Sequence, residues 1–292
     1  MHRRIFLAGM TCTVFTAHLA GQTITPVVDR TFGKFANAVS ISASAGGQLF
    51  VLDEAKNELS QFSIKGELLK TIGGKGWGDL EFDSPTDVST NFALDVYVAD
   101  YNNRRIQRYD RGLNFVQSIT ADNIVPALSG SFYPHASALS AQGELFVVES
   151  DGRRVLKFDP SQRFEREFGA FNGGAGALTN PSDIAVTPEG KVFVLDAPRV
   201  VEFDTYANYV SSIQLDSLPN PLTLNLSSHG LLVTSANDVR EYSFDGAREF
   251  DITHEGLIEN KSNDEFRDAV MIGPTLYLLT SHAVVVVKIV QQ

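Results

Sequence analysis

The sequence is nearly devoid of cysteine: 292 residues include one, Cys12. That residue lies in an N-terminal segment with the features of a targeting signal, so we expect the mature chain to contain none. A chain without cysteine has no disulfide framework, no reactive thiol and no cysteine ligand for a metal ion. Packing and hydrogen bonding alone must therefore stabilise the fold.

Positive charge is also scarce. The chain has 24 Lys and Arg residues against 35 Asp and Glu, a formal net charge of −11. Binding to nucleic acid rests on neutralising phosphates with basic side chains, so this composition argues against a nucleic-acid partner. Enzyme motifs are missing as well: there is no Gly-x-Ser-x-Gly elbow, no phosphate-binding loop and no His-Glu-x-x-His helix.

The longest apolar stretch lies at the N-terminus. Residues 1–21 contain a basic pair, Arg3-Arg4, an apolar run of about 15 residues and the small residues Ala20-Gly21. This run is short for a membrane span, so we predict a signal peptide cleaved before Gln22. Cleavage leaves 22 basic residues against 35 acidic ones and predicts a bacterial periplasmic or secreted protein without a membrane span. Because the basic pair also matches a twin-arginine motif, both export routes stay open.

The rest of the chain repeats one plan, clearest over residues 84–110. A proline opens the unit, an alternating strand ends in Asp100, a polar turn follows, and a second alternating strand comes next. Tetrapeptides similar to Tyr97-Val98-Ala99-Asp100 begin at Phe50, Phe146, Phe193, Leu232 and Tyr277. Their spacing of 39 to 49 residues indicates stacked supersecondary modules. Six copies predict one all-β domain over residues 22–292, a six-bladed β-propeller of four-stranded antiparallel blades.

The repeats resemble those of the NHL-repeat six-bladed propellers. In the second copy the resemblance rests on the segments 73–78 (GGKGWG), 85–88 (PTDV), 96–100 (VYVAD) and 103–110 (NRRIQRYD). It is strong in that copy, good in the first, third and fourth, and poor in the last two. The resemblance implies the fold; it does not name an activity, because the family is functionally mixed.

The two ends of the repeat region predict how the ring closes. Residues 26–32 resemble a fourth strand, whereas the last copy stops after its third strand, residues 284–289. We therefore predict that the N-terminal strand completes the last blade, which removes an open sheet edge.

Loops on a rigid scaffold carry function, and strand alternation places the second-to-third-strand turns and the connections between blades on one rim. Candidate ligand-binding residues on this rim are Trp77, Arg104, Arg105, Arg153 and Arg154. An exposed tryptophan can stack on a ligand, and arginines can bind a carboxylate or sulfate bidentately. The alternatives are a tryptophan that fills a gap between blades and arginines that pair with Asp100 or Glu149.

A second set of candidates lies at the starts of the innermost strands. Asp87, Asp183 and Asp268 recur on alternate copies, and three carboxylates around the axis can hold calcium or another hard cation. His135 stands at an equivalent start, and the resemblance implies a zinc alternative because the amidating-lyase branch uses a histidine-bound metal. The structural alternative, which we favour, is that these aspartates accept backbone amides; we therefore expect no cofactor.

From these observations we predict a monomeric, non-catalytic scaffold that binds a protein, peptide or glycan partner at the loop-bearing rim. The alternative is a metal-dependent enzyme on the same fold, similar to the amidating lyases or the gluconolactonases. An enzyme of that kind needs metal ligands that converge at the axis, whereas a binding protein needs only an exposed aromatic or charged patch.

Overall fold

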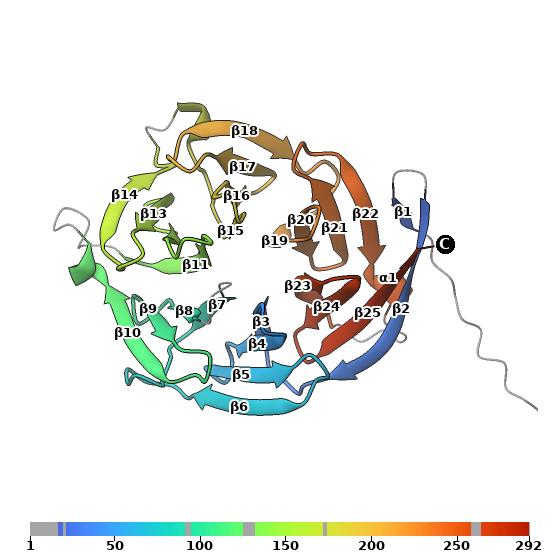
Figure 1. Cartoon of the computed structure of the whole chain (residues 1–292), viewed down its shortest axis with the longest axis horizontal. Coiled ribbons are helices and arrows are strands. Elements are labelled where there is room, and N and C mark those ends of the chain that lie inside the picture. Colours follow the sequence, from blue (N-terminus) through green and yellow to red (C-terminus); the bar gives the residue numbers. More distant parts are fainter. Residues whose placement is uncertain are drawn as a thin grey trace, which may run out of the picture.

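The computed structural model describes residues 17–19, 22–90, 95–124, 132–171, 174–257 and 264–291. Six antiparallel sheets stand around a central axis, and each blade contributes its first strand to the inside of the ring (Figure 1). This is the predicted six-bladed β-propeller. The described part of the chain contains one four-residue α-helix, α1 (His254–Leu257), and none of its helices is long and apolar enough to cross a membrane.

The blades follow one another in chain order. Blade one holds β3 (Ala38–Ala43), β4 (Gln48–Asp53), β5 (Glu58–Ser63) and β6 (Leu68–Gly73); blade two holds β7 (Pro85–Thr90), β8 (Val96–Asp100), β9 (Arg105–Tyr109) and β10 (Phe115–Thr120); blade three holds β11 (Pro134–Leu139), β12 (Leu145–Glu149), β13 (Arg154–Phe158) and β14 (Phe164–Phe168). Blade four holds β15 (Asp183–Val186), β16 (Val192–Asp196), β17 (Arg199–Phe203) and β18 (Tyr209–Gln214); blade five holds β19 (Pro221–Leu226), β20 (Gly230–Ser235), β21 (Asp238–Ser243) and β22 (Arg248–Thr253).

Blade six is completed by a strand from the other end of the chain. Its inner strands are β23 (Phe266–Ile272), β24 (Thr275–Thr280) and β25 (Val284–Gln291), and its outer strand is β2 (Gln22–Phe32). The antiparallel register pairs Pro26 with Ile289 and Phe32 with Val284. This confirms the predicted ring closure, with a β2 strand that begins earlier than expected. A short strand, β1 (Ala17–Leu19), lies outside β2 and belongs to the predicted signal segment.

The hydrophobic core is divided among the seams between blades. Every residue of β8, β12 and β16 is buried, because the second strand of a blade is covered on both faces by neighbouring sheets. One cluster shows the pattern: Phe50 and Leu52 of blade one pack with Val98 and Tyr109 of blade two. Packing across seams explains why the recurring tetrapeptides are apolar at successive positions rather than alternating.

Acidic residues at the ends of four second strands hold the loops that enter their blades. We call them the anchor acids: Asp53, Asp100, Glu149 and Asp196. Each is almost fully buried and accepts a backbone N–H from a residue 16 or 17 positions earlier. Because a buried carboxylate must be hydrogen bonded, the anchor acid in each of these four blades fixes the loop that precedes the blade.

Candidate binding site on the loop-bearing rim

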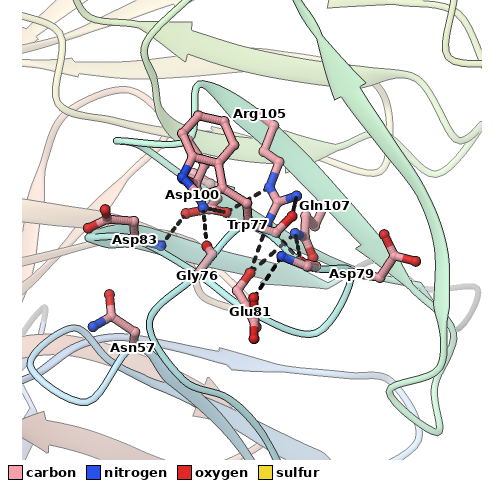
Figure 2. Close-up of polar contacts among 12 residues, drawn as sticks. Asn57, Gly76, Trp77, Asp79, Glu81, Asp83, Asp100, Arg105 and Gln107 are labelled. Atoms are coloured by element: carbon pink, nitrogen blue, oxygen red, sulfur yellow. Dashed lines mark hydrogen bonds and ion pairs between the residues drawn. The ribbon is translucent and has the colours of Figure 1, made fainter.

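The loop between blades one and two carries Trp77, and the buried side chain of Arg105 holds this loop through hydrogen bonds. Arg105 donates from Nη1 to the carbonyl oxygen of Trp77 (2.9 Å) and from Nη2 to those of Gly78 (2.9 Å) and Glu81 (2.8 Å). Its Nε lies 2.8 Å from the Oδ2 atom of Asp100, the anchor acid of the blade. Figure 2 shows this guanidinium between Asp100 and the loop.

Further hydrogen bonds hold the rest of the loop. Asn103 Nδ2 donates to the carbonyl oxygen of Gly76 (2.7 Å), and the Tyr109 hydroxyl donates to that of Asp79 (2.9 Å). Trp77 is nevertheless 71% exposed, and Leu80 in the same loop is also exposed. The loop therefore presents a large aromatic side chain to solvent on a backbone that is already ordered.

The four candidate arginines divide into two kinds. Arg105 and Arg154 face the protein and pair with the anchor acids Asp100 and Glu149. The residues before them, Arg104 and Arg153, are exposed and form no ion pair with the described residues. Only Arg104 and Arg153 are thus free to contact a ligand, and we assign Arg105 and Arg154 a structural role.

Aromatic side chains lie beside the free arginines. The Arg104 guanidinium carbon is 4.6 Å from the centre of the Tyr133 ring, a cation–π contact across the seam between blades two and three. Tyr133 packs on Tyr101 with ring centres 5.4 Å apart, and Tyr101 meets His135 edge to face at 6.1 Å. These residues form a continuous aromatic row along the rim.

A cavity of about 330 Å³ opens at the end of this row, between blades two, three and four. Its wall includes Tyr101, His135, Ser150, Arg153, Asn180 and Ser182. Burial lowers the pKa of His135, so the imidazole is neutral at pH 7. The cavity adjoins the mouth of the central channel, with which it shares Thr86, His135 and Ser182.

Three of the four predicted metal ligands lie together around the channel, and the fourth, His135, lies at its mouth. We call Asp87, Asp183 and Asp268 the axial acids; all three line a channel cavity of about 190 Å³. Each accepts a backbone N–H from the first strand of the following blade: Asp87 from Ser137 (2.8 Å), Asp183 from Leu224 (2.6 Å) and Asp268 from Ile41 (2.8 Å). The axial acids therefore link alternate seams of the ring.

Burial raises the pKa of every axial acid. The pKa of Asp87 rises from 3.8 to about 6 and that of Asp268 to about 7. The pKa of Asp183 is raised well above its ordinary value, by burial first and then by the charges of Asp87 and Asp268. No group of three or more His, Cys, Asp or Glu side chains in the described chain is arranged to hold a metal ion.

The histidines do not gather at one place. His135 lies at the channel mouth, whereas the His282 ring pairs with Asp264 (2.9 Å) and His254 Nε2 lies 3.0 Å from the carbonyl oxygen of the same residue. His229 is exposed in the turn between β19 and β20, on the opposite rim.

Sequence reasoning did not identify Tyr101 and Tyr133 as site residues. Tyr101 follows the second strand of blade two and Tyr133 precedes the first strand of blade three, 32 positions later. Their contact depends on the angle between neighbouring blades. The sequence indicated only their position, because both residues fall in segments that we had assigned to the loop-bearing rim.

Comparison with known proteins supports the fold and the repeat family. No protein-family model matches the chain. The protein brain tumor of Drosophila melanogaster is 29% identical over 132 residues, 44% of this chain and 12% of that protein. NHL repeat-containing protein 3 of Homo sapiens is 22% identical over 206 residues, 63% of this chain and 58% of that protein. The chain thus spans less than two thirds of either relative.

Solved structures with the same fold include a lyase, a gluconolactonase and a chain of a nidogen/laminin complex. A virginiamycin B lyase from Staphylococcus aureus aligns with a TM-score of 0.60 at 16% identity, covering 87% of this chain and 81% of that one. A gluconolactonase from Xanthomonas campestris aligns with a TM-score of 0.65 at 13% identity, covering 98% and 94%. A chain of a nidogen/laminin complex aligns with a TM-score of 0.61 at 12% identity, covering 83% and 94%. At these identities the likeness shows the fold alone.

Proposed function

Because the chain is an NHL-repeat six-bladed β-propeller, we propose that it is a non-catalytic scaffold that binds a protein or peptide partner at its loop-bearing rim. The observation that carries this proposal is Trp77, which is 71% exposed on a loop whose carbonyl groups are held by Arg105. Fold alone does not decide between binding and catalysis. The proposal therefore rests on this site.

An ordered loop with an exposed tryptophan has the energetic properties of a binding hot spot. Tryptophan is enriched among the few residues that dominate interface energies, because its large ring loses much contact with water when a partner covers it. Ordering a flexible loop on binding costs free energy, and a loop that is already fixed avoids that cost. The hydrogen bonds from Arg105 and Asn103 thus favour Trp77 as a contact residue.

The charges of the rim indicate the chemistry of the partner. Arg104 and Arg153 stand free at equivalent turns of neighbouring blades, on a chain whose net charge is −11. Arginines without an ion pair favour a partner that brings acidic groups to them. We propose a partner that combines an apolar contact for Trp77 with carboxylates for the arginines.

Site-specific photo-cross-linking tests this proposal. A photoreactive phenylalanine analogue replaces Trp77 in one variant and Tyr206 in the control; Tyr206 is 72% exposed in the turn between β17 and β18, on the opposite rim. We expect the Trp77 variant to yield a discrete adduct with one protein in extracts of the source cells. Equal labelling from both positions, or no adduct from Trp77, would contradict a rim-specific partner.

A metal-dependent lyase or lactonase is the second candidate, and the axial acids are the observation that favours it. Three carboxyl groups line one channel, and oxygen ligands are those that calcium prefers. Elemental analysis of protein purified without chelator or histidine tag distinguishes the candidates. One calcium or zinc ion per chain, lost on changing Asp87 to Asn, would support an enzyme, whereas protein without stoichiometric metal would support the scaffold.

We also propose that the protein functions outside the cytoplasm, after residues 1–21 are removed. The basic pair, the apolar run and the small residues before Gln22 support this proposal. Removal would take away β1 and leave β2, which closes the ring, in place. N-terminal sequencing of the exported protein tests it: we expect a sequence that begins at Gln22, and an intact Met1 terminus would contradict cleavage.

A further inference from the structure

We propose that the cavity beside Tyr101 and Arg153 is a binding site for a carboxylate group that is attached to a flat or apolar moiety. The inference rests on the proposed binding function and deepens it, since the cavity lies on the same rim and is defined by blades two, three and four. Its volume, about 330 Å³, is in the range of small-ligand sites. The cavity would take one terminal group of a partner or a free organic acid.

The composition of the wall selects for an anion. Among the described residues that line the cavity, Arg153 is the one charged side chain at pH 7, and none is Asp or Glu. This is unusual on a chain with 35 acidic residues and a net charge of −11. An arginine binds a carboxylate through two parallel N–H···O bonds, which adds geometric specificity to the charge attraction.

Arg153 is available for that role because its neighbour Arg154 pairs with the acids Glu149 and Glu167. Arg154 Nε lies 3.2 Å from Glu149 Oε2, and its Nη1 lies 2.8 Å from Glu167 Oε2. Arg153 has no ion pair, side-chain hydrogen bond or ring contact with the described residues, whereas the equivalent Arg104 packs on Tyr133. Of the two free arginines, Arg153 is thus the one without a protein partner, and it faces a cavity.

Neutral donors complete the site. The Asn180 amide and the Ser150 and Ser182 hydroxyls belong to the wall. The Ser182 Oγ atom is buried and has no hydrogen-bond partner in the described chain, a costly state that a ligand acceptor would relieve. Thr86, by contrast, already donates to the His135 carbonyl oxygen at 2.7 Å. An oxygen acceptor placed near Ser182 would therefore gain a hydrogen bond.

Tyr101 provides the apolar wall. Its ring is fixed between Tyr133 and His135, so it cannot turn away without breaking two aromatic contacts. A ring or a sugar face beside the carboxylate would stack on it. The adjoining channel mouth carries three acids, Glu54, Asp87 and Asp183, and one basic residue, Arg267. Because the acids outnumber the basic residue, they disfavour a second negative charge. A monoanionic carboxylate therefore fits better than phosphate or sulfate.

Titration by nuclear magnetic resonance tests the site with four probes at constant ionic strength. N-acetylphenylalanine represents the C-terminus of a peptide, benzoate represents a free organic acid, N-acetylphenylalanine amide lacks the charge, and sulfate is the dianion. We expect both acids to shift the Arg153 Nε–H signal with saturation. Tighter binding of N-acetylphenylalanine would identify a peptide terminus as the source, and tighter binding of benzoate would identify a small acid.

Matched variants make the result specific. Arg153→Gln should weaken binding of the acids at least about tenfold, because it removes a charged bidentate donor. Arg163→Gln, which changes an exposed arginine in the turn between β13 and β14, outside the cavity, should not change it. Equal melting temperatures would show that both variants are folded. No saturable shift, equal binding of the amide, preference for sulfate or unchanged affinity in Arg153→Gln would each overturn the inference.

The outcome separates this inference from the proposed function. A partner that cross-links at Trp77, together with an absence of carboxylate binding, would remove the cavity site and leave the scaffold. Carboxylate binding that depends on Arg153, without any adduct at Trp77, would leave the cavity site and remove the protein-binding rim.

Discussion

The anchor acids and the axial acids are both buried carboxylates in the same ring, and they differ in what surrounds them. Asp100, an anchor acid, has Arg105 at 2.8 Å and holds a loop of its own blade. Asp87, an axial acid, has hydroxyl and amide donors from neighbouring blades and other carboxyl groups across the channel. The anchor acid is thus neutralised by a basic side chain, whereas the axial acid has hydrogen-bond donors but no counter-charge.

This difference decides what each set can do. A buried ion pair fixes geometry, and removal of one partner is costly because the other charge remains buried. Buried carboxyl groups without a nearby cation have raised pKa values, so they take up protons closer to neutral pH. The stability of the contacts that they make between blades therefore depends on pH. Burial raises the pKa of the anchor acid Asp100 as well, although Arg105 and the hydrogen bonds to Asp100 act to lower it. The axis contains acids without a counter-charge, whose pKa values reach about 6 at Asp87 and about 7 at Asp268.

The largest effect is expected from Asp100→Ala. It leaves the Arg105 guanidinium buried without its counter-charge and removes the acceptor for the Asp83 amide. We expect the free energy of unfolding to fall by about 3–5 kcal/mol, measured by urea denaturation. Because Trp77 is the only tryptophan, its fluorescence anisotropy reports the loop directly and should decrease. A stable variant with unchanged anisotropy would remove the distinction between anchor and axial acids.

An intermediate effect is expected from Asp87→Asn, and it should depend on pH. Burial raises the pKa of Asp87 from 3.8 to about 6. A raised pKa in the folded state means that the folded protein binds the proton more tightly. The contribution of the Asp87 carboxyl group to the free energy of unfolding is therefore complete below about pH 4 and is lost as the pH rises through 6. The variant should reduce this decline by about 2 kcal/mol between pH 4 and 7.

The asparagine fits this position because the neighbouring groups can adapt. Its amide oxygen can accept the Ser137 N–H, and its NH₂ group can donate to the Ser40 hydroxyl, which lies 2.9 Å from Asp87 Oδ1. Asp110→Asn is the control with the opposite sign. Hydrogen bonds from the Asn114 side chain lower the pKa of this exposed acid, so its contribution is lost as the pH falls. A pH profile unaltered by Asp87→Asn would contradict proton uptake at the axis.

The smallest effect is expected from Arg163→Ala. Arg163 pairs with Asp159 at 2.8 Å, and its side chain is 79% exposed. Water screens this pair and both side chains lose entropy in forming it, so the free energy of unfolding should change far less than in Asp100→Ala. Denaturation at low and high salt checks this expectation. A loss similar to that of Asp100→Ala would show that burial is not what distinguishes the anchor pairs.

The fold could be predicted well from the sequence because every blade of the propeller buries the same strand faces with the same residue pattern. The apolar tetrapeptides recur since every second strand is covered on both faces, and the strand-like segment 26–32 predicted its own pairing with the end of the chain. The sequence predicted the candidate residues less completely. Arg104 and Arg105 are adjacent and identical, and their opposite roles follow from which one faces the Asp100 carboxylate.

The sequence by itself determined the six blades, the ring closure, the acidic character and the rim on which the loops gather. Local pattern and composition suffice for these, because each blade must bury the same faces in the same order. Only the tertiary structure decided that Tyr133 of blade three supports Arg104 of blade two, that Arg153 has no partner beside a cavity, and that the axial acids share a channel. These contacts cross seams between blades, and their geometry depends on the angles at which the sheets pack.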